Sequence, residues 1–241
     1  MPAVRAVGVI PARYAASRFP GKPLVAIAGR SLVRRVYEGT CGAKRLSRVI
    51  VATDDARIAA HCREFGAEVA MTSSDHPTGT DRIAEVARAL DEEIVVNVQG
   101  DEPLIEGHVI DAAVAALEQD PQAPMSTLAH PAEADGLDDP NRVKVVLDRQ
   151  GRALYFSRSR IPYERVPGAR YWQHVGLYAY RRSFLLQFVA LPAGELEQVE
   201  ALEQLRTLEN GHPIRVALVE GWRRAASTRA TSAGTSTGTL R

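Results

Sequence analysis

The chain has 241 residues and 45% of them are hydrophobic, so it can bury a large core as one α/β domain or two small ones. Its 30 basic and 29 acidic residues nearly balance, which argues against broad nucleic-acid binding through phosphate neutralisation. No apolar run reaches the roughly 18 to 20 residues that a membrane-spanning helix needs, and the first residues lack a signal peptide's apolar core, so we expect a cytoplasmic protein without membrane contact.

Residues 6–10 form a short apolar run, which is typical of a buried strand in a parallel sheet. The run breaks at Pro11 into a loop that carries Arg13, Arg18 and Lys22. In an α/β sheet, ligands bind to loops that leave the carboxyl ends of strands, and the guanidinium fork of Arg grips phosphate oxygens. The spacing therefore predicts a triphosphate-binding loop, with three solvated surface charges as an equally good alternative. The G-x-x-x-x-G-K-[ST] and G-x-G-x-x-G patterns are absent, which argues against a P-loop or a standard dinucleotide site.

The next segments alternate between helix and strand patterns, which predicts a parallel sheet with helices on both faces. Ser31 can cap the first of these helices. Thr53 and Asp54 follow a strand, where capping the next helix and contacting a ligand explain them equally well. The expected elements are a helix from residue 32, a strand over 49–52, a helix over 58–65 and a strand over 68–71.

A polar, turn-rich segment over 72–82 leads into another helix. Capping of that helix would by itself explain Thr80 and Asp81. His76 precedes a proline, and we interpret it as a surface residue outside the catalytic set.

Residues 93–98 are the most strand-like segment of the chain, and we expect them at the centre of the sheet. The segment runs directly into Gln99, Gly100 and Asp101. A carboxylate at the end of a central strand, opposite a basic loop on the neighbouring strand, is well placed to hold Mg²⁺ between triphosphate oxygens, because Mg²⁺ prefers hard oxygen ligands and keeps several waters. We therefore predict Asp101 as the metal ligand, with a plain turn as the alternative.

The second half of the chain adds a β-hairpin, predicted by the turn that Asp148 and Gly151 bound. His174 lies in a later strand pattern and is equally compatible with a core histidine and with a ligand contact. The elements expected here are a helix over 107–117, an irregular connection at the sheet's edge over 121–140, hairpin strands over 143–148 and 153–157, a strand over 172–180, one charged helix over 196–208 and a last strand over 214–219.

Six motifs occur in the order that one enzyme family shows. The first is the loop 10–24, which contains IPARY and SRFPGKPL, and the others are TDD at 53–55, NVQGDEP at 97–103, YFSR at 155–158, HVGLY at 174–178 and LEQLR at 202–206. Together they cover nearly the whole chain to about Val219 and closely resemble the 3-deoxy-manno-octulosonate cytidylyltransferases, or CMP-Kdo synthetases. Looser versions of the first motif occur in other sugar nucleotidyltransferases, including CMP-sialic acid synthetases.

The resemblance implies a Rossmann-like nucleotidyltransferase fold of the α/β class, with a mixed, mostly parallel central sheet and helices on both faces. It implies a domain over 1–220, in which about 140–180 includes the hairpin for sugar binding and dimer contact. The reaction would transfer CMP from CTP to Kdo, with attack of the sugar's C2 hydroxyl on the α-phosphate, as a step of lipopolysaccharide biosynthesis. Mg²⁺ would be the cofactor, CTP and Kdo the partners, and a homodimer the assembly.

The resemblance also assigns roles to residues, and no general base stands out among them. Arg13, Lys22 and Asp101 would be catalytic, with Asp101 as the metal ligand. The nucleotide would be held by Arg13, Arg18, Lys22 and Thr80. The sugar would be held by Gln99, Arg158, His174, Tyr178, Glu203 and Gln204. The alternatives are a nucleotidyltransferase for another sugar, such as a sialic acid or a sugar 1-phosphate, and a non-catalytic nucleotide-binding homologue.

The segment 221–241 departs from the family pattern. It contains no Asp or Glu and no apolar periodicity, a composition that favours disorder. The family carries here an Asp that is the second Mg²⁺ ligand, followed by a closing amphipathic helix. An altered reading frame or an artefact that replaces the native ending is the preferred explanation, and a diverged member is the other. On either explanation we expect reduced or absent turnover.

Overall fold

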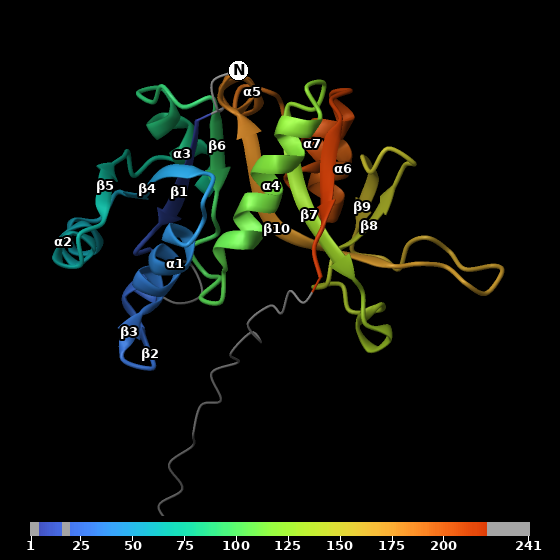
Figure 1. Cartoon of the computed structure of the whole chain (residues 1–241), viewed down its shortest axis with the longest axis horizontal. Helices are drawn as coiled ribbons and strands as arrows, with labels where there is room; N and C mark the ends of the chain where they lie inside the picture. The colour runs from blue at the N-terminus through green and yellow to red at the C-terminus, as the bar shows by residue number, and fades with distance from the viewer. Residues whose placement is uncertain (1–4, 16–19, 221–241) are drawn as a thin grey trace, which may run out of the picture.

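The computed structural model describes residues 5–15 and 20–220, and a nine-stranded sheet runs through this part of the chain (Figure 1). The main path of the sheet has the order β11-β7-β10-β6-β1-β4-β5, which puts β6 at its centre as the sequence predicts. The strands of the parallel half are β1 (Ala6–Ala12), β4 (Leu46–Thr53), β5 (Glu68–Met71) and β6 (Ile94–Asn97).

The other half of the sheet is mixed. The long strand β10 runs antiparallel to both of its neighbours β6 and β7, and β11 adds in parallel to β7 at the edge. The hairpin β8–β9 extends the sheet from β10, which confirms the predicted hairpin. The bounds are β7 (Met125–Pro131), β8 (Lys144–Leu147), β9 (Ala153–Ser157), β10 (Trp172–Arg181) and β11 (Ile214–Leu218). The predicted α/β class with a mixed, mostly parallel sheet is therefore confirmed.

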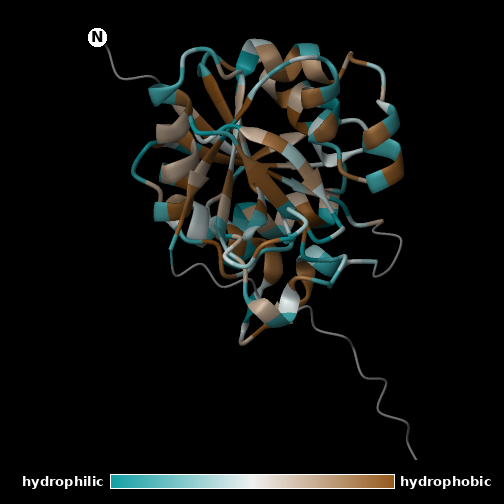
Figure 2. Cartoon of the chain, turned by 90° about the vertical axis from the view of Figure 1, so that its right-hand side faces the viewer, coloured by the Kyte–Doolittle hydropathy of each residue, from teal (hydrophilic) through white to brown (hydrophobic). Residues whose placement is uncertain are grey.

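Helices cover both faces of the sheet, because successive strand side chains point to opposite sides. In β1, Ile10 joins the apolar cluster on one face and Val9 joins the cluster on the other. Figure 2 shows the apolar residues gathered on the strands, between helices with hydrophilic outer sides. One face carries α1 (Leu32–Cys41), α2 (Ala56–Glu64) and α4 (Gly107–Gln119), and the other carries α3 (Gly79–Ala87), α5 (Arg182–Phe188) and α7 (Leu205–Glu209).

Capping groups fix where these helices begin. Ser31 caps α1 as predicted, since its side chain accepts a hydrogen bond from the Arg34 backbone N–H. Asp55, rather than Thr53 or Asp54, caps α2. Smaller elements complete the described chain: the 3-10 turns at Lys22–Leu24 and Ala134–Gly136, the ribbon of β2 (Ala26–Ile27) and β3 (Arg30–Ser31), and α6 (Glu195–Glu200). No helix within 5–15 and 20–220 is long and apolar enough to cross a membrane.

The irregular edge connection expected over 121–140 was wrong, because β7 lies inside the sheet between β11 and β10. The sequence of this strand hides it, since Ser126 and Thr127 resemble loop residues. Both are fully buried, and their hydroxyls donate to the carbonyl oxygens of Ala113 and Leu177, at 2.7 and 2.8 Å. Internal hydrogen bonds thus offset the cost of burying two polar side chains.

The single charged helix expected over 196–208 was also wrong. The structure has two short helices, α6 and α7, separated by a turn in which Ala201 adopts a left-handed conformation with φ 50°. The guanidinium of Arg158 donates to the carbonyl oxygens of Glu200 and Ala201, so a side chain satisfies the end of α6 in place of the next helical turn. Glu203 and Gln204 consequently lie in the turn ahead of α7.

Candidate active site

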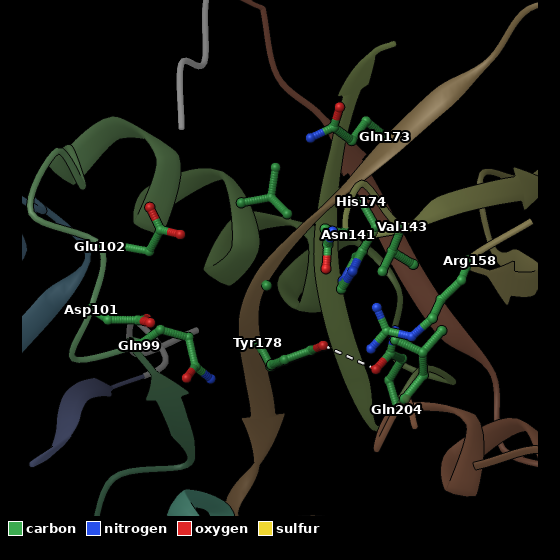
Figure 3. Close-up of a pocket in the computed structure, with 13 residues that line it drawn as sticks. Gln99, Asp101, Glu102, Asn141, Val143, Arg158, Gln173, His174, Tyr178 and Gln204 are labelled. Carbon is green, nitrogen blue, oxygen red and sulfur yellow. Dashed lines mark hydrogen bonds between the residues drawn. The ribbon is translucent and has the colours of Figure 1, made fainter. Parts of the chain in front are cut away.

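A pocket of about 390 Å³ opens where the exit of β6, the middle of β10, the hairpin and the α6–α7 turn meet. Figure 3 shows Gln99, Asp101 and Glu102 on one side of the pocket and Arg158 and Gln204 on the other. Its lining consists of Gln99, Asp101, Glu102, Asn141, Val143, Arg158, Gln173, His174, Val175, Gly176, Tyr178, Leu202 and Gln204.

The basic loop of β1 lies beside the acidic loop of β6, as the sequence predicts, because the two strands are parallel neighbours. The Lys22 ammonium donates to the Asp101 carboxylate across 2.9 Å, and both side chains are about half exposed. Arg13 donates to the backbone carbonyl of His76 at 2.6 Å, which connects the same loop to the segment ahead of α3. Asp101 lines the pocket, whereas Arg13 and Lys22 do not, so the cationic loop is connected to the pocket through the bond between Lys22 and Asp101. Arg18 lies outside the described residues.

His174 stands in the back of the pocket on β10. Its Nε2 lies 2.9 Å from the hydroxyl of Thr127, and its ring packs edge-on against Phe156 with centroids 4.9 Å apart. Tyr178, four residues along the strand, also packs against the ring, with centroids 5.5 Å apart. The imidazole is thus half-buried and oriented by its neighbours while it lines the pocket, and its contact with a ligand stays a prediction.

Tyr178 and Gln204 form a hydrogen-bonded pair at the pocket wall. The Tyr178 hydroxyl donates to Gln204 Oε1 at 3.1 Å (Figure 3). Burial raises the pKa of Tyr178, so the hydroxyl keeps its proton and remains a donor. The amide Nε2 of Gln204 is buried and makes no hydrogen bond within the described part of the chain. Because a buried N–H without a partner is costly, this amide is poised to donate to an acceptor in the pocket.

Arg158 lines the pocket and also braces it. Its guanidinium donates to the carbonyl oxygens of Glu200, Pro140 and Ala201, at 2.6, 2.9 and 3.1 Å. These bonds hold the turn that carries Gln204 against the hairpin. The arginine predicted as a sugar contact therefore has a structural role as well.

Thr80 and Glu203 do not line the pocket. The buried Thr80 hydroxyl donates to Glu203 Oε2 at 2.6 Å, so the predicted nucleotide contact and one predicted sugar contact bind each other. Burial raises the pKa of Glu203, and the hydroxyl of Thr80 opposes that rise.

Several lining residues escaped the sequence analysis. Gln173 is a polar residue within the strand predicted over 172–180, a signal that could have identified it, and the structure buries it. Asn141 follows a segment interpreted as an edge connection, and no local pattern distinguishes it. Thr127, which supports His174, lies in the strand that the sequence analysis missed.

Asp101 is the residue best suited to hold a metal. No group of three or more His, Cys, Asp or Glu side chains gathers to hold a metal among residues 5–15 and 20–220. A carboxylate that already attracts the Lys22 ammonium suits Mg²⁺, which takes one or two carboxylates and completes its shell with phosphates and water. The donor set fits a metal that arrives with a phosphate ligand.

Comparison with known proteins finds relatives over most of the chain. The family model described as cytidylyltransferase matches residues 7–215. The chain is similar to the 3-deoxy-manno-octulosonate cytidylyltransferases of Syntrophotalea carbinolica (55% identical over 219 residues, 86% of this chain and 88% of the relative) and Syntrophobacter fumaroxidans (55% over 222 residues, 89% of each).

Among solved structures, it resembles a CMP:2-keto-3-deoxy-manno-octonic acid synthetase complexed with CTP. The TM-score is 0.86 and the identity 44%, over 89% of this chain and 90% of that one. A cytidylyltransferase from Leptospira borgpetersenii, 14% identical with a TM-score of 0.58 over 90% of this chain and 76% of that one, shares the fold alone.

Proposed function

This chain belongs to the 3-deoxy-manno-octulosonate cytidylyltransferase family, and on that premise we propose that it transfers CMP from CTP to 3-deoxy-D-manno-octulosonate (Kdo). The products are CMP-Kdo, for lipopolysaccharide biosynthesis, and pyrophosphate. One observation carries the proposal: Asp101, bound to Lys22 of the cationic loop, faces a wall of oriented polar side chains across a single pocket.

The β1 loop is proposed to bind the triphosphate of CTP. Arg13 and Lys22 neutralise the charge that builds on the phosphates, and Arg18 helps to hold them. Little covalent chemistry is asked of the protein, because positioning and charge stabilisation dominate this class of transfer. The solved relative is complexed with CTP, which supports CTP as the nucleotide.

Asp101 is proposed to hold Mg²⁺ together with phosphate oxygens. When bound, the ion withdraws charge from the phosphates and lowers their repulsion against the incoming hydroxyl oxygen. Lys22 then exchanges the carboxylate for a phosphate, so the ion pair at 2.9 Å is a contact of the nucleotide-free site.

The opposite wall is proposed to orient Kdo. Gln204 donates its unpartnered Nε2 to a sugar oxygen, while Tyr178 fixes the orientation of that amide. Gln99, His174 and Arg158 line the same pocket and provide further polar contacts for the hydroxyls and the carboxylate. The C2 hydroxyl of the sugar attacks the α-phosphate, and pyrophosphate leaves.

A homodimer in the cytoplasm is part of this proposal, from the family resemblance. The connection between β9 and β10 projects from the body (Figure 1) and exposes Tyr163 by 89% and Val166 by 77%. Exposed apolar groups on a projecting segment suit contact with a second copy. Size-exclusion chromatography with light scattering of the chain tests this, since a monomer at micromolar concentration would contradict it.

Acceptor competition tests the proposed activity. Pyrophosphate release from CTP and Mg²⁺ is measured with Kdo, a sialic acid or a sugar 1-phosphate as the acceptor. We expect release with Kdo and little with the others. Preference for another sugar would instead identify a different sugar nucleotidyltransferase, and CTP binding without release from any acceptor would support a non-catalytic homologue.

The segment 221–241 lies outside the described residues, so the prediction for it rests on composition. Because it has no acidic residue, a second carboxylate for Mg²⁺ cannot come from it. We propose that replacing it with the ending of an acid-containing relative raises turnover. An unchanged rate would contradict that.

A further inference from the structure

A line of buried and half-buried polar side chains connects the two walls of the active site. We infer that Glu203 is a positioning residue, which sets the acceptor wall against the nucleotide side through Thr80 rather than by contacting Kdo. The inference rests on the proposed function, since it assigns a role within that reaction.

The contact between Glu203 and Thr80 is short and shielded. Their oxygens lie 2.6 Å apart, and Thr80 is 3% exposed. Thr80 belongs to the first turn of α3, which Thr78 and Asp81 fix with a reciprocal capping box. The hydroxyl that holds Glu203 is therefore part of a rigid helix start.

From Thr80 the line continues into the central strand. Asn97, the last residue of β6, donates its amide to the Thr80 hydroxyl at 3.5 Å, and Gln99 donates to Asn97 Oδ1 at 3.4 Å. Gln99 lines the pocket two residues before Asp101. These two long hydrogen bonds link the first turn of α3 to the loop that carries Asp101.

On the other side, Glu203 shares its backbone with Gln204. Glu203 faces α3, while Gln204 faces the pocket and Tyr178. Loss of the bond to Thr80 releases the turn and moves the Gln204 amide. Such a shift misplaces the bound substrate, and a misplacement of about 1 Å can lower the reaction rate a hundredfold.

The charges around Glu203 support a positioning role. Arg206, the nearby cation, is bound through two bonds to Glu197, so it attracts Glu203 without pairing with it. Asp81 repels it. A largely desolvated carboxylate without an ion-pair partner is costly, and the hydroxyls of Thr80 and Thr78 supply the hydrogen bonds that stabilise it.

A double-mutant cycle tests the inference on the full chain. Thr80→Val, Glu203→Ala and the double variant are compared for kcat and for the KM of each substrate. We expect each single variant to raise the KM for Kdo about tenfold, with the KM for CTP within about twofold of wild type, and the double variant to be no worse than the worse single one. Additive effects, or a rise confined to the KM for CTP, would overturn the inference.

Conservative variants separate positioning from a general structural role. Glu203→Gln keeps an acceptor oxygen and Thr80→Ser keeps the hydroxyl. The KM for Kdo of both variants should therefore lie close to the wild-type value, unlike that of Glu203→Ala and Thr80→Val. A raised KM for Kdo in both conservative variants would also overturn the inference. CTP binding by calorimetry shows that each variant is folded, and Thr80→Ala replaces the valine variant if that one does not fold. Absence of Kdo turnover both in the wild-type chain and in the chain given an acid-containing ending would contradict the proposed function itself, before any variant is compared.

Discussion

Gly100 lies where the loop that leaves β6 approaches the loop that leaves β1. A Cβ at this position would stand 2.6 Å from the Pro11 carbonyl oxygen, whereas real Cβ atoms essentially never come within 3.0 Å of another atom. Alanine must therefore separate the loops by at least about 0.4 Å, because the obstacle is backbone. Asp101 follows directly and is bound to Lys22 of the β1 loop, so the shift moves the metal ligand relative to the triphosphate loop. Since about 1 Å of misplacement can cost a hundredfold, we expect kcat to fall about tenfold.

Steady-state pyrophosphate release from CTP and Kdo measures this loss. Gly66→Ala is the matched control, because Gly66 has φ 80°, has no atom within 4 Å of its would-be Cβ, and precedes β5 at the amino edge of the sheet. Backbone strain there should cost about 1 kcal/mol in the free energy of unfolding and leave kcat unchanged. A Gly100→Ala enzyme with kcat within about twofold of wild type would refute the reasoning.

The other predictions concern charged groups. Arg206→Met should lower the free energy of unfolding by about 3 kcal/mol, because it leaves the nearly buried Glu197 carboxylate without its two-bond partner; a loss below about 1 kcal/mol in urea would contradict this. Burial raises the pKa of Glu203 above its ordinary 4.5, so the folded state binds more protons than the unfolded state above that pH, and stability is lost as pH rises from 4.5 through the raised pKa. Glu203→Gln removes this loss, so the variant should gain stability relative to wild type in melting curves from about pH 4 to 7, and a constant difference would count against it. Asp101→Asn should lower kcat at least about a hundredfold in Mg²⁺, and near-normal turnover would exclude Asp101 as the metal ligand.

The parallel half of the fold could be predicted because its signals are local. The apolar run of β1 and the strand that ends at Asn97 are short and bounded by loops, so their carboxyl ends, with Lys22 and Asp101, were expected at one edge of the sheet. The ion pair between those two residues, 79 positions apart, follows from that topology.

The rest depends on contacts that no local pattern encodes. β7 is polar in sequence, and partners on α4 and β10 satisfy Ser126 and Thr127 only once the sheet is assembled. The side chain of Arg158 donates to the Glu200 carbonyl oxygen at the end of α6, and the two residues are 42 positions apart in the sequence. Thr80 and Glu203, 123 positions apart, were assigned separate ligands, whereas the fold brings them together.

The most direct test of the central claim is ³¹P NMR of this chain incubated with CTP, Kdo and Mg²⁺. If the chain is a CMP-Kdo synthetase, CTP signals convert, even if slowly, into pyrophosphate and one phosphodiester in equal amounts, and only when Kdo is present. CTP that binds but remains unconverted in the presence of Kdo, both with this chain and with the chain given an acid-containing ending, would contradict this function.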